Sequence, residues 1–86
     1  MYYVYAGSYT VEDNAINQAV NLFKAGYDVI CTKTKRFLRL QVGEFEKYEN
    51  AVNFRDQLNK NGFPAFIEEN VERKPMSWQL TYLTQN

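Results

Sequence analysis

The first half of the chain alternates between strand-like and helix-like spacing of its hydrophobic residues. Tyr2–Ala6 is rich in strand-forming side chains, and the Gly-Ser pair after it is typical of a turn or a bulge. A helix is expected next, begun by a capping pair of Thr10 and Asp13. Its apolar face recurs at helical spacing and comprises Ala15, Ala19, Leu22 and Phe23. Gly26 is expected to end this helix, and the alternation over residues 27–31 predicts a second strand.

The same pattern returns in the second half, so the chain consists of two similar strand–helix–strand units. Gly7 matches Gly43, and Gly26 matches Gly62 at the same separation along the sequence. The second unit is expected to contain a strand, a helix and a strand, at Phe37–Val42, about Tyr48–Lys60 and Phe63–Glu68. Pro64 within the last of these favours an edge strand, where a missing N–H donor costs no hydrogen bond.

Two such units are expected to form an α+β domain of the ferredoxin-like type, in which a four-stranded antiparallel sheet carries both helices on one face. The predicted first and third strands are central in such a sheet. Val4 and Ala6 would then face the helices, and strand alternation sends five side chains to the opposite face, called the open face: Tyr3, Tyr5, Phe37, Arg39 and Gln41.

The open face is a candidate binding surface. Flat rings stack on the apolar faces of sugars or bases, while Arg39 and Gln41 can supply orienting hydrogen bonds. Two alternatives stay open: aromatic residues suit strands in general, and the C-terminal tail would block this surface if it folded over it.

Composition narrows the possible functions. The 86 residues suit one small domain, and a hydrophobic content of 45% with an aromatic content of 16% indicates a packed core. A formal net charge of zero provides no general attraction to polyanions. The single cysteine, Cys31, excludes an internal disulfide and lies in an alternating apolar run typical of a buried thiol. No apolar run approaches the ~20 residues that span a bilayer, and the N-terminal region does not resemble a signal peptide, so no membrane insertion is expected.

An enzyme is the class of protein that this composition supports least. The chain has no histidine, which excludes Ser–His and Cys–His catalysis and leaves only carboxylates for a metal site. The acidic pairs Glu44/Glu46 and Glu68/Glu69 are more typical of solvated charges than of a glycosidase pair. We therefore expect a non-catalytic chain without a cofactor or a metal.

RNA-recognition domains are one alternative, because they share this topology and stack bases on the two central strands. The predicted third strand and its approach, KRFLRLQV, lacks the glycine–aromatic pattern of their RNA-binding motif, and the net charge is zero. We therefore expect no nucleic-acid partner, with RNA binding kept as an alternative.

Several short motifs in both units resemble the SPOR domain, the sporulation-related repeat of bacterial cell-envelope proteins. They are Val4-Gly7-Ser8-Tyr9, Asn14-Ala15, Gly26-Tyr27, Val42-Gly43-Phe45 and the GFPAF run at 62–66. This resemblance divides the chain into a SPOR-like repeat domain at 1–68 and a C-terminal extension at 69–86. It implies a non-catalytic module that binds peptidoglycan glycan strands stripped of their stem peptides. A parent protein, such as an amidase or a phage endolysin, would carry it to the bacterial cell wall or envelope.

The resemblance also implies particular binding residues on the open face. Positions that match the family pattern are Ser8, Phe37, Arg39 and Ile67. Strand alternation by itself turns Ile67 toward the helices instead. The glutamine that is usual in the first strand of the family falls at Tyr5, and Gln41 supplies an amide at the corresponding place in the second unit.

Positive charge gathers beside this candidate site, at Lys33, Lys35, Arg36 and Arg39. Removing the stem peptides of peptidoglycan leaves a lactyl carboxylate on each muramic acid, and such a patch would suit that group. The alternative is a solvated loop whose charges deter edge pairing between strands.

The C-terminal extension has no counterpart in the repeat. Alternation over Ser77–Leu83 predicts a fifth strand with an apolar stripe of Trp78, Leu80 and Tyr82. This strand would close an edge of the sheet, or it would bridge to a second copy and form a homodimer. An assembly module without affinity for glycan is therefore the second alternative function.

Overall fold

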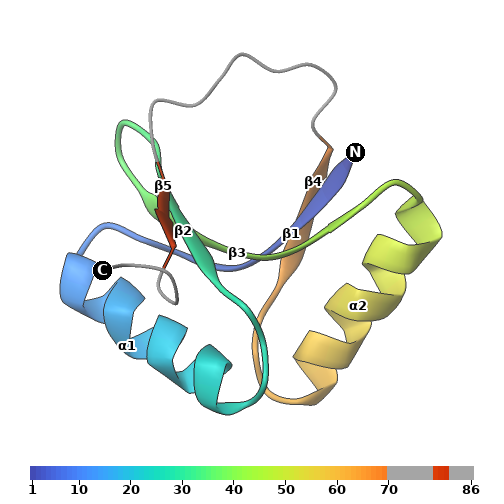
Figure 1. Cartoon of the computed structure of the whole chain (residues 1–86), viewed down its shortest axis with the longest axis horizontal. Helices are drawn as coiled ribbons and strands as arrows, with labels where there is room; N and C mark the ends of the chain where they lie inside the picture. Colours follow the sequence, from blue (N-terminus) through green and yellow to red (C-terminus); the bar gives the residue numbers. More distant parts are fainter. Residues whose placement is uncertain (70–78, 82–86) are drawn as a thin grey trace.

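The computed structural model describes residues 1–69 and 79–81, which form one antiparallel sheet and two helices (Figure 1). The strands are β1 (Tyr2–Tyr9), β2 (Ile30–Lys33), β3 (Leu38–Phe45), β4 (Phe66–Glu69) and β5 (Gln79–Thr81). The helices are α1 (Glu12–Lys24) and α2 (Tyr48–Lys60). The strand order is β4-β1-β3-β2-β5. The predicted α+β, ferredoxin-like fold with an extra C-terminal strand is therefore confirmed, and β1 lies beside β3 within the sheet.

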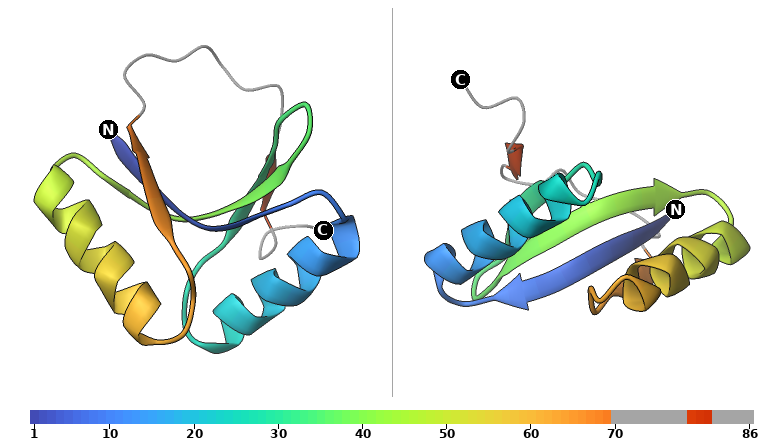
Figure 2. Two further views of the ribbon diagram at one scale, coloured as in Figure 1. Left: turned by 180° about the vertical axis from the view of Figure 1, so that it is seen from behind. Right: turned by 90° about the horizontal axis from the view of Figure 1, so that it is seen from below.

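Both helices pack against the same face of the sheet (Figures 1 and 2). Helix α1 contacts β1 and β3, and α2 contacts β1, β3 and β4. Between the two layers lies a core of small and aliphatic side chains: Val4, Ala6, Ala15, Ala19, Leu22, Val29, Leu40, Val42, Ala51 and Leu58. Leu22 and Leu58 hold equivalent positions in the two units, and both are fully buried. The repeat in the sequence is therefore a repeat of core positions.

Both helices end at the predicted glycines through the same hydrogen-bonded turn. The N–H of Tyr27 donates to the C=O of Leu22 at 3.0 Å, and the second unit repeats this bond at 2.9 Å. The φ angles of Gly26 and Gly62 are +100° and +93°. Glycine adopts such angles without the steric penalty that a Cβ atom brings, which explains why it ends both helices.

The beginning of α1 differs from the prediction. Val11 rather than Thr10 occupies the N-cap, and no side chain caps the first turn of α1 or α2 by a hydrogen bond. Glu12 and Asp13 lie in the first turn of α1, where carboxylates interact favourably with the helix dipole. The Phe23 side chain, predicted to lie on the apolar face, is exposed. Leu22, the preceding residue, points into the core instead. Because successive residues lie about 100° apart around a helix, Phe23 is turned away from that direction.

Strand β2 begins three residues later than expected because Tyr27 belongs to a cluster of aromatic rings. The Tyr27 ring makes edge contacts with Phe54 and Phe63, at centroid distances of 5.8 Å and 6.0 Å. The hydroxyl of Tyr27 also accepts a hydrogen bond from the amide group of Asn61 at 3.1 Å. These contacts link the loop after α1 to α2 and the loop that follows it.

Strand β4 also begins later than expected, at Phe66, so Pro64 precedes the strand rather than lying on it. The N–H of Ala65 donates to the side-chain oxygen of Asn59 at 3.0 Å. This bond connects the segment before β4 to the end of α2. It also uses the N–H of Ala65, which is then not available for pairing between strands.

Strand β1 continues through Gly7-Ser8 as a bulged strand, so of the turn and the bulge predicted there, the structure has the bulge. Its register against β3 shifts between Tyr5 and Ser8, which leaves Ser8 opposite Arg39. Gly7 has a φ of +134°, and a Cβ atom there would lie 2.5 Å from the Tyr9 ring. The glycine is thus required at the bulge, and the bulge places Ser8 on the same face as Arg39.

The C-terminal strand closes one edge of the sheet. Strand β5 pairs antiparallel with β2, with Leu80 opposite Cys31. Closing an edge was one of the two roles expected for this segment. Trp78 and Tyr82, together with the rest of 70–78 and 82–86, lie outside the described residues. Neither of the helices described is long and apolar enough to cross a membrane.

Candidate functional site

Strand register assembles the open face from three neighbouring strands. Tyr5 on β1 lies opposite Gln41 on β3 and opposite Phe66 on β4. Ser8 lies opposite Arg39, as described above. Directly opposed residues of an antiparallel pair project to the same face. The structure therefore brings together most of the predicted site residues, and it adds Phe66.

The centre of the open face is a stack of two rings. The Tyr5 and Phe66 rings have centroids 5.4 Å apart and planes inclined by 26°. The Tyr3 and Tyr5 rings form an edge contact, with centroids 6.5 Å apart. Tyr5 is only 7% exposed, whereas Phe66 is 38% exposed. Phe66 thus presents ring surface to solvent, while the buried Tyr5 supports it from within the sheet.

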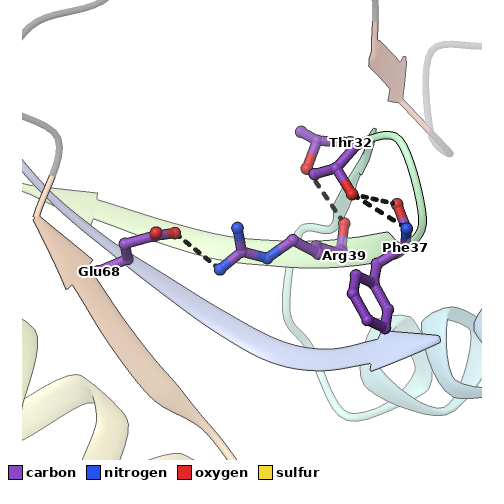
Figure 3. Close-up of polar contacts among 5 residues, drawn as sticks. Thr32, Phe37, Arg39 and Glu68 are labelled. Carbon is purple, nitrogen blue, oxygen red and sulfur yellow. Dashed lines mark hydrogen bonds and ion pairs between the residues drawn. The ribbon is translucent and has the colours of Figure 1, made fainter.

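The Arg39 side chain extends across β1, from β3 toward β4 (Figure 3). Its guanidinium carbon lies 4.3 Å from the centroid of Tyr5 and 5.4 Å from that of Phe66. Its Nη2 group donates to Oε1 of Glu68 at 2.7 Å. We call Tyr3, Tyr5, Arg39, Phe66 and Glu68 the ring–arginine cluster.

The contacts within this cluster hold Arg39 in a fixed place. A guanidinium over an aromatic face gains about 0.5–2 kcal/mol, and a partly exposed ion pair adds up to about 1 kcal/mol. The Arg39 side chain is 21% exposed and that of Glu68 is 50% exposed. The guanidinium is therefore preorganised over the rings, and the carboxylate that balances its charge lies at the more solvated side.

Phe37 lies apart from this cluster, one residue before β3. The backbone N–H of Phe37 donates to Oγ1 of Thr34 at 3.0 Å, and its C=O accepts from the Thr34 N–H at 2.8 Å. These bonds close the turn between β2 and β3, as Figure 3 shows in part. The Phe37 side chain is 42% exposed, so it presents a second ring surface near the end of Arg39 that is farther from Glu68.

Ile67, which the resemblance suggested as a site residue, lies on the opposite face of the sheet from Arg39. Its side chain packs against the hydrophobic core. Ile67 lies between Phe66 and Glu68 on β4, and both of these contact Arg39 on the open face. Strand alternation therefore turns Ile67 toward the helices, as the periodicity by itself predicts.

The basic residues do not form one continuous patch around Arg39. Lys33 ends β2 opposite Leu38, a residue that packs against the core. Lys35 and Arg36 lie in the turn between β2 and β3 and are exposed. Arg39, the remaining member, lies on β3 and is paired with Glu68. The positive charge at the centre of the face is thus largely balanced.

Phe66 and Glu68 were not among the predicted site residues. Their neighbour Ile67 was expected to face inward by alternation, and that same alternation sends Phe66 and Glu68 outward. The signal was therefore present in the strand period. The strand period does not identify the partner of Glu68. That partner is Arg39 on β3, and β1 lies between β3 and β4.

Two titratable groups outside this cluster, Cys31 and Tyr9, have raised pKa values. Burial raises the pKa of the Cys31 thiol, with a smaller contribution from the charge of Glu12. Burial also raises the pKa of the Tyr9 hydroxyl. Raised values keep both groups protonated at neutral pH, so neither is activated as a nucleophile. No cluster of acidic or cysteine side chains suited to a metal ion occurs within residues 1–69 and 79–81.

Comparison with known proteins gives one family match and one structural match. The profile of the SPOR domain family matches residues 1–69. Among solved structures, the chain is similar to the peptidoglycan-binding domain of the B. subtilis cell wall lytic enzyme CwlC. The two share 28% sequence identity and a TM-score of 0.68, and the similarity covers 78% of this chain and 85% of that domain. No curated protein sequence shows significant similarity to the chain.

Proposed function

This chain belongs to the SPOR domain family, and we propose that it is a non-catalytic module that binds the glycan strands of peptidoglycan through its open face. Its structural neighbour is a peptidoglycan-binding domain, which supports the same ligand class. The ring–arginine cluster is the observation that carries the proposal for the face itself.

The chemistry of the cluster suits a flat, polar polymer. The exposed ring of Phe66 provides an apolar surface on which the apolar face of a sugar stacks. Arg39 donates hydrogen bonds, Glu68 accepts them, and the Gln41 amide can do both, so hydroxyl and acetamido groups find partners beside the ring. Phe37 offers a second stacking surface at the β2–β3 turn. This combination binds sugars without any group that would cleave them.

The module would serve a parent protein. The neighbour is a domain of a cell wall lytic enzyme, which supports an attached hydrolase such as an amidase or a phage endolysin. Tethering to the polymer raises the local concentration of such an enzyme on its substrate. The place of action would then be the bacterial cell wall or envelope. A homodimer formed through the C-terminal strand stays a separate prediction.

Pelleting of the purified chain with peptidoglycan sacculi tests the proposal. Sacculi are used untreated and after an amidase has removed their stem peptides, each with and without RNA as a competitor. Binding that rises after stripping and is indifferent to RNA supports a glycan ligand. Equal binding to both preparations points to another wall epitope. Binding to neither contradicts the proposal and favours an assembly role, and displacement by RNA favours the RNA-binding alternative.

A further inference from the structure

Glu68 occupies one of the hydrogen-bonding positions at which Arg39 would bind an anionic ligand. Its Oε1 atom accepts from Nη2 of Arg39 at 2.7 Å, the distance typical of a charge-assisted bond between guanidinium and carboxylate. A carboxylate on a bound sugar would seek the same kind of contact. Glu68 therefore resembles an internal ligand for Arg39.

Within this pair, Arg39 is the anchored partner and Glu68 is the one able to leave. The guanidinium lies over Tyr5 and Phe66, and moving it away would give up both ring contacts. Glu68 belongs to β4, which is one of the two edge strands of the sheet, and its side chain is half exposed. A rotation of Glu68 into solvent costs the ion pair alone.

The other charged residues near the open face do not supply further positive charge at the ring–arginine cluster. On the neighbouring strands, Glu44 and Glu68 both lie opposite Tyr3, so carboxylates flank the ring from β3 and β4. The exposed cations Lys35 and Arg36 lie beyond this region, in the β2–β3 turn. An anionic sugar placed over the ring–arginine cluster therefore meets one guanidinium whose charge is already balanced.

We propose that Glu68 is a specificity-determining residue, which competes with ligand carboxylates for Arg39 and so lowers the affinity of the open face for acidic glycan relative to neutral glycan. The inference rests on the proposed function, since it concerns how the same face selects among sugars. It revises the expectation that Arg39, as part of a basic patch, suits the lactyl carboxylate of a bound glycan. Arg39 and Glu68 together present a neutral, polar pair, and acidic sugars bind only as far as they displace Glu68.

The test compares Glu68→Gln with wild type on two forms of one ligand. The first is soluble glycan released from amidase-stripped peptidoglycan, which carries lactyl carboxylates. The second is the same material after its carboxylates have been converted to amides. Glutamine keeps the size and the carbonyl acceptor of Glu68 but removes its charge. Glu69→Gln is the matched control, because Glu69 lies opposite Tyr2, a residue packed against the core, on the other face of the sheet.

Glu68→Gln should bind the carboxylate form about two- to fivefold more tightly than wild type, the change expected from one partly exposed ion pair. Its affinity for the amidated form should show no such gain, and Glu69→Gln should match wild type on both ligands. When Arg39→Gln is also present, Glu68→Gln should no longer give this gain on the carboxylate form. Circular dichroism establishes that each variant is folded.

Three results would overturn the inference. An equal gain on both ligands would mean that the charge of Glu68 does not discriminate acidic from neutral sugar. Unchanged affinity would mean that it does not compete, and a loss on both ligands would make Glu68 a residue that positions Arg39. In all three cases wild type still binds glycan and the proposed function stands. Failure of wild type to bind either ligand would overturn the proposed function and this inference together.

Discussion

The rings of Tyr5 and Phe66 stack across the β1–β4 pair, with their centroids 5.4 Å apart. Because Tyr5 is buried beneath this contact, the two residues play different parts. Tyr5 fixes the height and tilt of Phe66 and supports Arg39, while Phe66 offers its ring to solvent. Affinity for sugar should therefore depend directly on Phe66.

Phe66→Ala should weaken binding to amidase-stripped sacculi by about tenfold, because it removes a stacking surface worth roughly 1–3 kcal/mol. Phe66→Leu should recover less than half of the binding free energy that Phe66→Ala loses, since a branched aliphatic side chain lacks a flat face. Sedimentation of the variants with sacculi over a range of wall concentrations measures both changes. Tyr48→Ala, which removes an exposed aromatic ring from α2, is the control and should bind as wild type does.

The double variant Phe37→Ala with Arg39→Ala should lose at least tenfold in wall binding while keeping its fold. It removes one ring surface and the guanidinium that links β3 to β1 and β4. The matched control is Tyr48→Ala with Arg55→Ala, which removes an exposed ring and an ion-paired arginine from α2 instead. Native circular dichroism combined with unchanged binding of the first variant would rule out this site.

Gly43→Ala should lower the free energy of unfolding by about 1–3 kcal/mol, as expected for overpacking. A Cβ atom at this position would lie 2.9 Å from ring carbons of both Phe45 and Phe54. The Phe54 ring cannot move freely, because it packs against the rings of Phe45 and Tyr27, at centroid distances of 5.2 Å and 5.8 Å.

Urea unfolding of Gly43→Ala, Phe54→Leu and the combination measures this coupling. The smaller leucine should relieve part of the clash, so the double variant should be less destabilised than the sum of the single ones. Strict additivity would show that Phe54 does not restrict the position of Gly43.

Stability should fall at alkaline pH, and part of this loss should depend on Cys31. Burial and the charge of Glu12 raise the pKa of Cys31, so the folded state holds the thiol proton more tightly than the unfolded chain does. This contribution is complete below the unfolded pKa of about 8.5 and is lost as the pH rises through the higher folded pKa.

Cys31→Ala should therefore show a smaller decrease in free energy of unfolding than wild type between about pH 8 and pH 10. Urea titrations at several pH values provide the measurement. The raised pKa of Tyr9 stays in both proteins and contributes equally to the comparison. Parallel pH profiles for the two proteins would contradict the assigned environment of Cys31.

Regular periodicity made much of the fold predictable from the sequence. Helix α2 has the bounds that were expected, because its apolar spacing is regular and Gly62 ends it. The duplicated pattern also identified β1 and β3 as the strands that supply the centre of the open face. In each case the determining contacts are local or follow from one repeated period.

Contacts between distant segments limited the rest of the prediction. Gly7 and Gly43 occupy the same place in the two units, yet Gly7 permits a bulge and Gly43 makes room for Phe54. The ion pair between Arg39 and Glu68 depends on the register of β3, β1 and β4 together, including the shifts around Tyr5. Strand alternation predicts the face that a residue occupies, but it does not identify the neighbour across two strands.

The most direct test of the central claim is an NMR titration of the isotope-labelled chain with soluble glycan from amidase-stripped peptidoglycan. The claim is that glycan binds the open face. The largest shift changes should then occur at the backbone amides of β1, β3 and β4 around Tyr5, Arg39 and Phe66, and at the side-chain amide of Gln41. Changes confined to α1 and α2, on the other side of the sheet, would contradict the claim.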